Sequence, residues 1–137
     1  MSDTQRNIET VRGIYAAFGR GDVAAILAPI ADDVDWEFGY PHNDDIPWLK
    51  SGKGKRQAAS FFETLRGFEF HRFDVVAVAG AGEHVISLVA LEATWKPTGR
   101  RLIEPCEAHV WRFDPSGRVV AMRHAADTRQ HARIAGV

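Results

Sequence analysis

The stretch from residue 102 to 127, LIEPCEAHVWRFDPSGRVVAMRHAAD, constrains the fold of this chain more than any other part of the sequence. At its middle, Asp114-Pro115-Ser116-Gly117 has the composition of a tight turn, because proline fixes φ at the first central position and glycine accepts a positive φ at the end. Runs rich in apolar residues lie on both sides of this turn. The stretch therefore predicts two long antiparallel strands joined as a hairpin.

Alternation along the first of these strands separates two faces. One face is predicted to carry Ile103, Pro105, Glu107, His109, Trp111 and Phe113, and the other Glu104, Cys106, Ala108, Val110 and Arg112. On the first face a carboxylate and an imidazole are two residues apart, with Cα atoms about 6–7 Å from each other. On the second strand His124 shares a face with Met122, although the phase stays open because residues 119–121 are apolar on both faces. Such a polar strand pair is typical of a lined cavity rather than of a plain core.

Size and charge limit the class of protein. A chain of 137 residues is predicted to form one domain, residues 1–137, with a substantial core. Its 17 Lys and Arg residues are balanced by 18 Asp and Glu, so there is no electrostatic reason to expect nucleic acid or a membrane surface as a partner. The polar N-terminus MSDTQRNIET has no apolar signal core, which predicts a cytoplasmic location.

Helical periodicity occurs in three segments before residue 67, each with apolar residues spaced by three and four. The three apolar stripes are Ile8, Val11, Ile14, Tyr15 and Phe18; then Val23, Ile26, Leu27 and Ile30; then Ala58, Phe61, Phe62 and Leu65. Ser2 or Asp3 is predicted to cap the first helix, which ends at Gly19-Arg20-Gly21. Asp22 is predicted to cap the second, and the third covers residues 55–66.

The remaining segments read as strands. Residues 34–38 alternate as a short strand with Val34, Trp36 and Phe38 on one side. Residues 39–54 are rich in turn formers and predict a loop, and residues 68–79 and 84–96 predict two long strands before the hairpin. Asp127 begins a short terminal helix with a capping-box pattern. The predicted architecture is α+β, with helices packed on one face of a curved antiparallel sheet.

Several motifs occur in a definite order along the chain. They are YAAFGRGD at 15–22, DVDW at 33–36, GKGK at 52–55 followed by Phe61-Phe62, AHVW at 108–111, and Asp127-Thr128. Their order and spacing resemble the SnoaL-like, ketosteroid isomerase-related proteins of the nuclear transport factor two-like superfamily. The resemblance spans nearly the whole chain. It implies a cone, the cystatin-like α+β roll, in which the sheet and three helices on its concave face enclose a pocket and the outer sheet face forms a homodimer.

The resemblance does not extend to the catalytic residues of the steroid isomerases. Aligned on WRFD at 111–114, His109 occupies the position of their acidic oxyanion-hole residue. The position of their catalytic aspartate falls at Phe38, and that of their oxyanion-hole tyrosine falls nearer Ile14 than Tyr15. Two of the three catalytic roles are thus unfilled or displaced.

From these residues we predict a largely apolar pocket that binds a small hydrophobic molecule without a cofactor. His109, oriented by Glu107, is expected to transfer a proton or to donate a hydrogen bond to an enolate in an isomerase, cyclase or lyase-type reaction on a carbonyl compound, with His124 as a second polar group. The predicted walls are Tyr15, Phe18, Trp36, Phe38, Trp48, Trp111 and Met122. Two alternatives stay open: a ligand-binding protein without catalysis, and a dimerisation domain with a filled core.

Other polar residues receive simpler interpretations. Glu107, His109 and His124 have the ligand types of a facial metal triad, but their spacing carries no metal signature, so no metal is predicted. Tyr40, His42, Asp44 and Asp45 lie on the loop expected at the cavity mouth, either contacting substrate or simply hydrated. Arg112, Arg123 and Glu92 are predicted on the outer sheet face, as ion pairs of a dimer.

Overall fold

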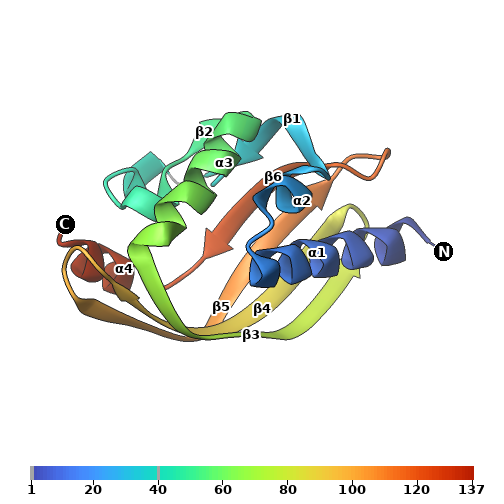
Figure 1. Ribbon diagram of the computed structural model, residues 1–137. Helices are drawn as coiled ribbons and strands as arrows, with labels where there is room; N and C mark the ends of the chain where they lie inside the picture. The colour runs from blue at the N-terminus through green and yellow to red at the C-terminus, as the bar shows by residue number, and fades with distance from the viewer. Residues whose placement is uncertain (1, 40) are drawn as a thin grey trace.

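The computed structural model describes residues 2–39 and 41–137 and shows an α+β fold (Figure 1). Its α-helices within these ranges are α1 (Asp3–Arg20), α2 (Val23–Leu27), α3 (Lys55–Thr64) and α4 (Thr128–Ala135). Its strands are β1 (Ile30–Trp36), β2 (Gly52–Lys53), β3 (Phe68–Ala81), β4 (His84–Trp95), β5 (Arg100–Phe113) and β6 (Val119–Ala125). The predicted fold class is confirmed.

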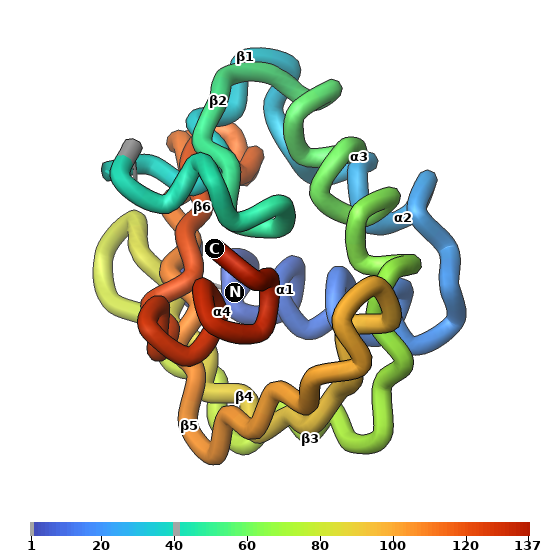
Figure 2. Tube along the Cα trace, turned by 90° about the vertical axis from the view of Figure 1, so that its left-hand side faces the viewer, coloured from blue at the N-terminus to red at the C-terminus, as the bar shows by residue number. Residues whose placement is uncertain are grey.

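The strands form one sheet in the order β2-β1-β6-β5-β4-β3. The strands β3 to β6 pair antiparallel with their neighbours, as the sequence predicts, whereas β1 runs parallel to β6 and places Trp36 beside Met122. The long strands bend, and α1, α2 and α3 lie on the concave side of the curved sheet (Figures 1 and 2). In the described part of the chain, no helix is both long and apolar enough to cross a bilayer.

Helix α1 forms as the sequence predicts. The Ser2 side chain accepts a hydrogen bond from the backbone N–H of Gln5, and the helix ends at Gly21, whose φ of 69° is favourable for glycine. Val11 and Ile14 face the core on the predicted apolar stripe. The side of α1 that carries Tyr15 therefore points into the concave face of the sheet.

Several predicted boundaries were wrong. The early strand covers Ile30–Trp36 rather than residues 34–38, and Gly52–Lys53 of the predicted loop form β2. Helix α2 ends at Leu27, because Pro29 cannot continue a helix, and Ile30 instead begins β1. Strand β3 continues through Gly80 to Ala81, so the turn into β4 falls at residues 82–83 rather than 80–82. Helix α3 ends at Thr64 and continues as a 3₁₀ turn from Leu65 to Gly67.

A β-bulge in β5 changes which side chains of this strand face the core. Glu107 pairs with Val89, but Glu104 pairs with Leu91, so β5 has one residue more than β4 between these pairs. Pro105 lies in this bulge, where its missing N–H breaks no ladder hydrogen bond. N-terminal to the bulge, the predicted faces were therefore wrong. Glu104 is buried, and Ile103 and Pro105 are exposed.

Candidate active site

A cavity lies on the concave side of the sheet, between two clusters of buried apolar residues. Its free space, counted with its open mouth, is about 690 Å³. The lining residues are Ile14, Tyr15, Phe18, Trp36, Trp48, Leu49, Phe61, Phe62, Leu65, Phe68, Phe70, Phe73, Leu91, Leu102, Glu107, His109, Trp111, Met122, His124 and His131. This set includes every residue that the sequence analysis placed at the site except Phe38. The cavity argues against a domain with a filled core.

Phe38 lies outside the cavity because the chain turns before reaching it. Strand β1 ends at Trp36, and Glu37 adopts a φ of 54°, in the left-handed region that residues other than glycine rarely occupy. The Phe38 ring lies beneath the guanidinium of Arg123, whose Cζ is 5.5 Å from the ring centroid. The expected alternation of Trp36 and Phe38 on one face therefore does not occur.

Glu37, which the sequence analysis did not select, is fully buried and paired with His124. Its Oε1 contacts Nδ1 of the imidazole, and its Oε2 accepts the backbone N–H of His124 at 3.2 Å. Burial alone would lower the pKa of His124, but the negative charge of Glu37 outweighs it and raises the pKa above its usual value. His124 is thus held as an imidazolium with Nδ1 towards Glu37.

A chain of hydrogen bonds crosses the cavity wall next to this pair. The Tyr15 hydroxyl is 2.5 Å from both Ser87 Oγ and His109 Nδ1. His109 Nε2 is 3.2 Å from Glu107 Oε2, and the indole N–H of Trp111 donates to Ser87 Oγ at 3.3 Å. The chain therefore joins α1, β4 and β5 through side chains alone.

The direction of each hydrogen bond follows from the protonation states. Burial and the nearby charge of His124 lower the pKa of His109, so its ring is neutral with one N–H. That N–H must be Nε2–H, since a carboxylate can only accept, and Nδ1 then accepts the Tyr15 hydroxyl proton. Burial raises the pKa of Tyr15, which keeps the phenol protonated. Both ring nitrogens of His109 are thus engaged.

Glu107 keeps its negative charge in this setting. Burial by itself would raise the pKa of Glu107, but the hydrogen bond from His109 and the positive charges that His109, His124 and His131 carry when protonated lower it to about 2. The imidazoles of His109 and His124 also lie edge to face, with ring centroids 4.6 Å apart. The end of the cavity where these rings meet therefore combines one imidazolium, one neutral imidazole and one carboxylate.

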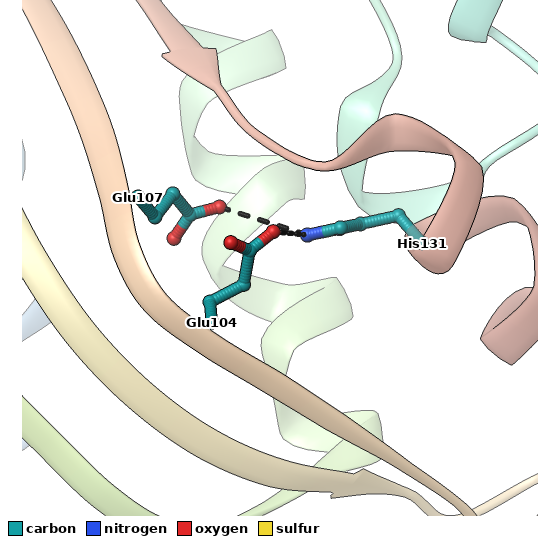
Figure 3. Close-up of side chains that lie close together, drawn as sticks. All are labelled: Glu104, Glu107 and His131. Atoms are coloured by element: carbon teal, nitrogen blue, oxygen red, sulfur yellow. Dashed lines mark hydrogen bonds and ion pairs between the residues drawn. The ribbon is translucent and has the colours of Figure 1, made fainter.

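A second polar cluster is formed by Glu104, His131 and Trp48. Figure 3 shows Glu104 and His131 of this cluster beside Glu107. The indole N–H of Trp48 donates to His131 Nδ1 at 2.8 Å, and His131 Nε2 lies 2.9 Å from Glu104 Oε1. Because an indole can only donate, Nδ1 must be an acceptor, and the single proton of His131 is on Nε2. His131 is therefore neutral and donates to Glu104.

The position of this proton determines whether the cluster can bind a metal ion. One ligand atom each from Glu104, Glu107 and His131 lie within 4.8 Å of one another, a spacing that a metal could bridge. A metal needs the lone pair of Nε2, but Nε2 carries the proton as long as Trp48 donates to Nδ1. The hydrogen bond from Trp48 thus opposes metal binding here.

The other polar residues of the sequence analysis lie away from the cavity. His42, Asp44 and Asp45 are exposed, and Asp44 accepts hydrogen bonds from the backbone N–H and hydroxyl of Ser51. Tyr40 lies outside the described residues. Asp127 caps α4 as predicted, but its own N–H donates to Glu104 rather than to Gln130, so the capping box is incomplete.

Four buried polar residues of the site escaped the sequence analysis: Glu37, Ser87, Glu104 and His131. His131 had a usable signal, because it stands three residues before Ile134 on the buried side of the predicted terminal helix. Pro105 was a signal for the bulge that buries Glu104. No sequence pattern around Glu37 predicted its positive φ.

A curved sheet that encloses a cavity together with its helices defines the nuclear transport factor two-like class of α+β proteins. The profile of the SnoaL-like domain matches residues 11–122, so the chain belongs to the SnoaL-like domain family. The resemblance stated from the sequence is thereby confirmed.

Solved structures with the same fold include a protein of unknown function. This NTF2-like protein from Burkholderia pseudomallei K96243 is 28% identical, with a TM-score of 0.80 and 100% of both chains covered. An epoxide hydrolase from M. tuberculosis is 19% identical, with a TM-score of 0.70 over 96% of this chain and 90% of the other. A candidate polyketide cyclase from Xanthomonas campestris pv. campestris is 19% identical, with a TM-score of 0.71 over 98% and 99%. No curated protein sequence matches the chain.

Proposed function

We propose that this protein catalyses a cofactor-independent acid–base reaction on a small hydrophobic carbonyl compound, with His124 as the proton-donating group. The observation that carries the proposal is the pairing of His124 with the buried carboxylate of Glu37 at the wall of an apolar cavity. Within the described residues Nε2 of His124 makes no hydrogen bond, so its N–H is available to a ligand. A carboxylate behind an imidazole fixes its orientation and favours the imidazolium.

The proposed chemistry needs a donor where negative charge develops on oxygen. As a carbonyl compound passes a proton from the carbon next to its C=O group to a solvent water molecule, the electron pair of the broken C–H bond moves into the enolate and charge accumulates on the carbonyl oxygen. An imidazolium in a cavity with apolar walls stabilises that charge more than it would in water. His124 would then donate a hydrogen bond or its Nε2 proton to the oxygen.

His109 receives a different role from the one that the sequence suggested. Its Nε2–H is donated to Glu107 and its Nδ1 accepts from Tyr15, so neither ring nitrogen is free for a substrate. In this proposal His109 is a positioning residue that holds the Tyr15 hydroxyl beside the cavity. Tyr15 keeps one hydroxyl lone pair beyond its bonds to Ser87 and His109.

The names of two structures with this fold, an epoxide hydrolase and a candidate polyketide cyclase, denote enzymes that act on small molecules. That supports a catalytic use of the cavity here. The competing function is a binding protein in which the same residues only orient a ligand. Both functions predict binding, and only the first predicts turnover.

Hydrogen–deuterium exchange distinguishes them. A panel of aryl alkyl ketones is incubated with the protein in D₂O, and loss of the proton signal next to the carbonyl is followed by NMR. We expect exchange with the natural protein and loss of at least about tenfold in rate for His124→Gln and Glu37→Gln, within the usual contribution of a general acid or base. His84→Gln, at an exposed position, is the matched control.

If His124→Gln exchanges as fast as the natural protein, His124 is not the proton donor. If the ketones raise the melting temperature but no exchange occurs, the protein binds such compounds without the proposed chemistry.

A further inference from the structure

Glu107 is a buried carboxylate with one unused oxygen. Its residue is only 3% exposed. Oε2 accepts the N–H of His109, but Oε1 makes no hydrogen bond within the described residues. The neighbouring donor to Oε1 is His131 Nε2, 3.8 Å away, and that proton is already donated to Glu104 at 2.9 Å (Figure 3).

In the described part of the structure, Glu107 has no cation of its own, because the charge of His124 that stabilises its carboxylate is shared with Glu37. Among the described residues, the basic side chains within 4.0 Å of the Glu107 carboxylate are those of His109 and His131, and none is Lys or Arg. Both rings are neutral, because each uses Nδ1 to accept a hydrogen bond. The positive charge of His124 is balanced by Glu37. Burying a carboxylate that only shares a cation is costly, so a positive group from outside the chain would be favoured.

Glu107 also lines the cavity. Among the described residues, Trp36 Nε1 is the single fully buried side-chain nitrogen or oxygen that lacks a hydrogen-bond partner. Oε1 also lacks a partner without being fully buried, and Glu107 is one of the residues that line the cavity. An occupant of the cavity can therefore reach it.

The surroundings of this oxygen suit an organic cation. Trp48, Phe68 and Tyr15 line the same cavity, and the rings of Trp48 and Phe68 lie edge to face with centroids 4.7 Å apart. Aromatic rings together with a carboxylate are the groups that recognise ammonium ions in proteins. Glu104 adds a second carboxylate behind the wall, within 4.8 Å of Glu107.

We propose that Glu107 Oε1 binds a protonated amine, so that the ligand of this protein is a hydrophobic compound that carries a basic nitrogen. We also propose that the same ligand presents an oxygen to His124. This second statement rests on the proposed function, whereas the amine site does not. The cavity would thus bind the cationic group of the ligand at Glu107 and a hydrogen-bond acceptor of the ligand at His124, with apolar walls between them.

Paired probes test the amine site directly. Benzylamine and 2-naphthylmethylamine are each compared with the alcohol of the same carbon skeleton, by calorimetric titration and by thermal shift at neutral pH. We expect each amine to bind at least about tenfold more tightly than its alcohol, because only the amine carries a charge. Glu107→Gln should abolish this preference, and Glu63→Gln, with a side chain that is 71% exposed, should keep it.

The comparison in the natural protein does not depend on whether Glu107→Gln folds. If the amines bind no better than the alcohols, the amine site is overturned, even if deuterium exchange still supports the role of His124. If the amines bind better but Glu107→Gln, folded, keeps the preference, the site is also overturned. A preference lost in Glu107→Gln supports the site, and it does so even if no ketone exchanges and the proposed reaction fails.

Discussion

The carboxylate of Glu37 holds His124 at two atoms, the ring Nδ1 and the backbone N–H, from a residue whose φ is 54°. A left-handed backbone at a residue other than glycine costs about 1–3 kcal/mol. The conformation is fixed on the other side by the Glu37 N–H, which donates to the carbonyl of Met122 at 2.7 Å. The strained backbone of Glu37 thus places the carboxylate that raises the pKa of His124.

Replacing Glu37 by Gln should lower the pKa of His124. The amide keeps the shape of the side chain but removes the negative charge that opposes the effect of burial, so the pKa should fall from its raised value to below the ordinary 6.5. NMR titration of the histidine ring signals measures this. Asp35→Asn, on the same strand with a side chain that is not buried, is the control and should leave His124 unchanged. A titration of His124 that is identical in Glu37→Gln would contradict the assigned pairing.

Three buried groups predict how stability depends on pH. Burial lowers the pKa of His109 below 6.5, so the free energy of unfolding should fall as the pH drops below 6.5. The pKa of Glu107 is lowered from 4.5 to about 2, and a further loss of up to about 3 kcal/mol follows between these values. The raised pKa of His124 stabilises the fold below 6.5, and this contribution is lost as the pH rises through its folded pKa. Stability should therefore be highest near pH 6.5.

Urea unfolding from about pH 3 to 9 gives this profile. His124→Gln should remove the decline on the alkaline side and keep the decline on the acid side, because Glu107 remains. A natural protein whose free energy of unfolding rises steadily from acid to alkaline pH would show that the protonation of His124 is assigned wrongly.

Three buried tryptophans should respond differently to replacement by phenylalanine. Trp48 and Trp111 donate their indole N–H to His131 and Ser87, whereas Trp36 Nε1 has no hydrogen-bond partner among the described residues. Each replacement loses similar ring volume, but Trp48→Phe leaves Nδ1 of His131 without a donor, which costs about 1–3 kcal/mol, whereas Ser87 Oγ keeps its hydrogen bond with Tyr15 in Trp111→Phe. Trp36→Phe should therefore be less destabilising than Trp48→Phe by about that amount in urea unfolding, with Trp111→Phe between them. Equal losses for Trp36→Phe and Trp48→Phe would mean that the indole hydrogen bond of Trp48 contributes nothing.

Strand alternation was sufficient to predict part of the site. Because β5 is regular from Glu107 to Phe113, the period of two correctly placed His109 and Trp111 on the inner face. The pairing of His109 with His124 across β5 and β6 then resolves the phase that the sequence left open, and His124 lines the cavity. These positions could be predicted because the backbone around them is regular.

The misplaced residues all follow a local departure from regular backbone. The bulge beside Pro105 shifts the phase by one residue, which turns Glu104 inward and Ile103 outward. The positive φ of Glu37 also changes which side chains face the core at the end of β1. It turns the carboxylate of Glu37 into the core and Phe38 away from it. Periodicity assumes a constant repeat, so it cannot anticipate an inserted residue or a left-handed one.

The outer face of the sheet carries exposed apolar side chains that suit a second copy of the chain. Ile86 and Ile103 are 47% and 51% exposed, and each stands between two buried neighbours, so both point away from the cavity. Glu92 and Arg101 form an ion pair on the same face at 3.2 Å. Apolar residues with charges of both signs can be self-complementary across a two-fold axis, so the predicted homodimer, if formed, would use this face.

Light scattering coupled to gel filtration tests this dimer. The natural protein should elute with twice the 15.2 kDa mass of one chain, and Ile86→Glu should elute as a monomer, because two new carboxylates would face an apolar partner surface. Val137→Glu introduces the same change at another exposed apolar residue and should remain dimeric. If the natural protein is a monomer at tens of micromolar, or if Ile86→Glu stays dimeric, the outer face is not the interface. Ile86 lies on the opposite face from the cavity, so a monomeric Ile86→Glu should still bind the ketone and amine probes.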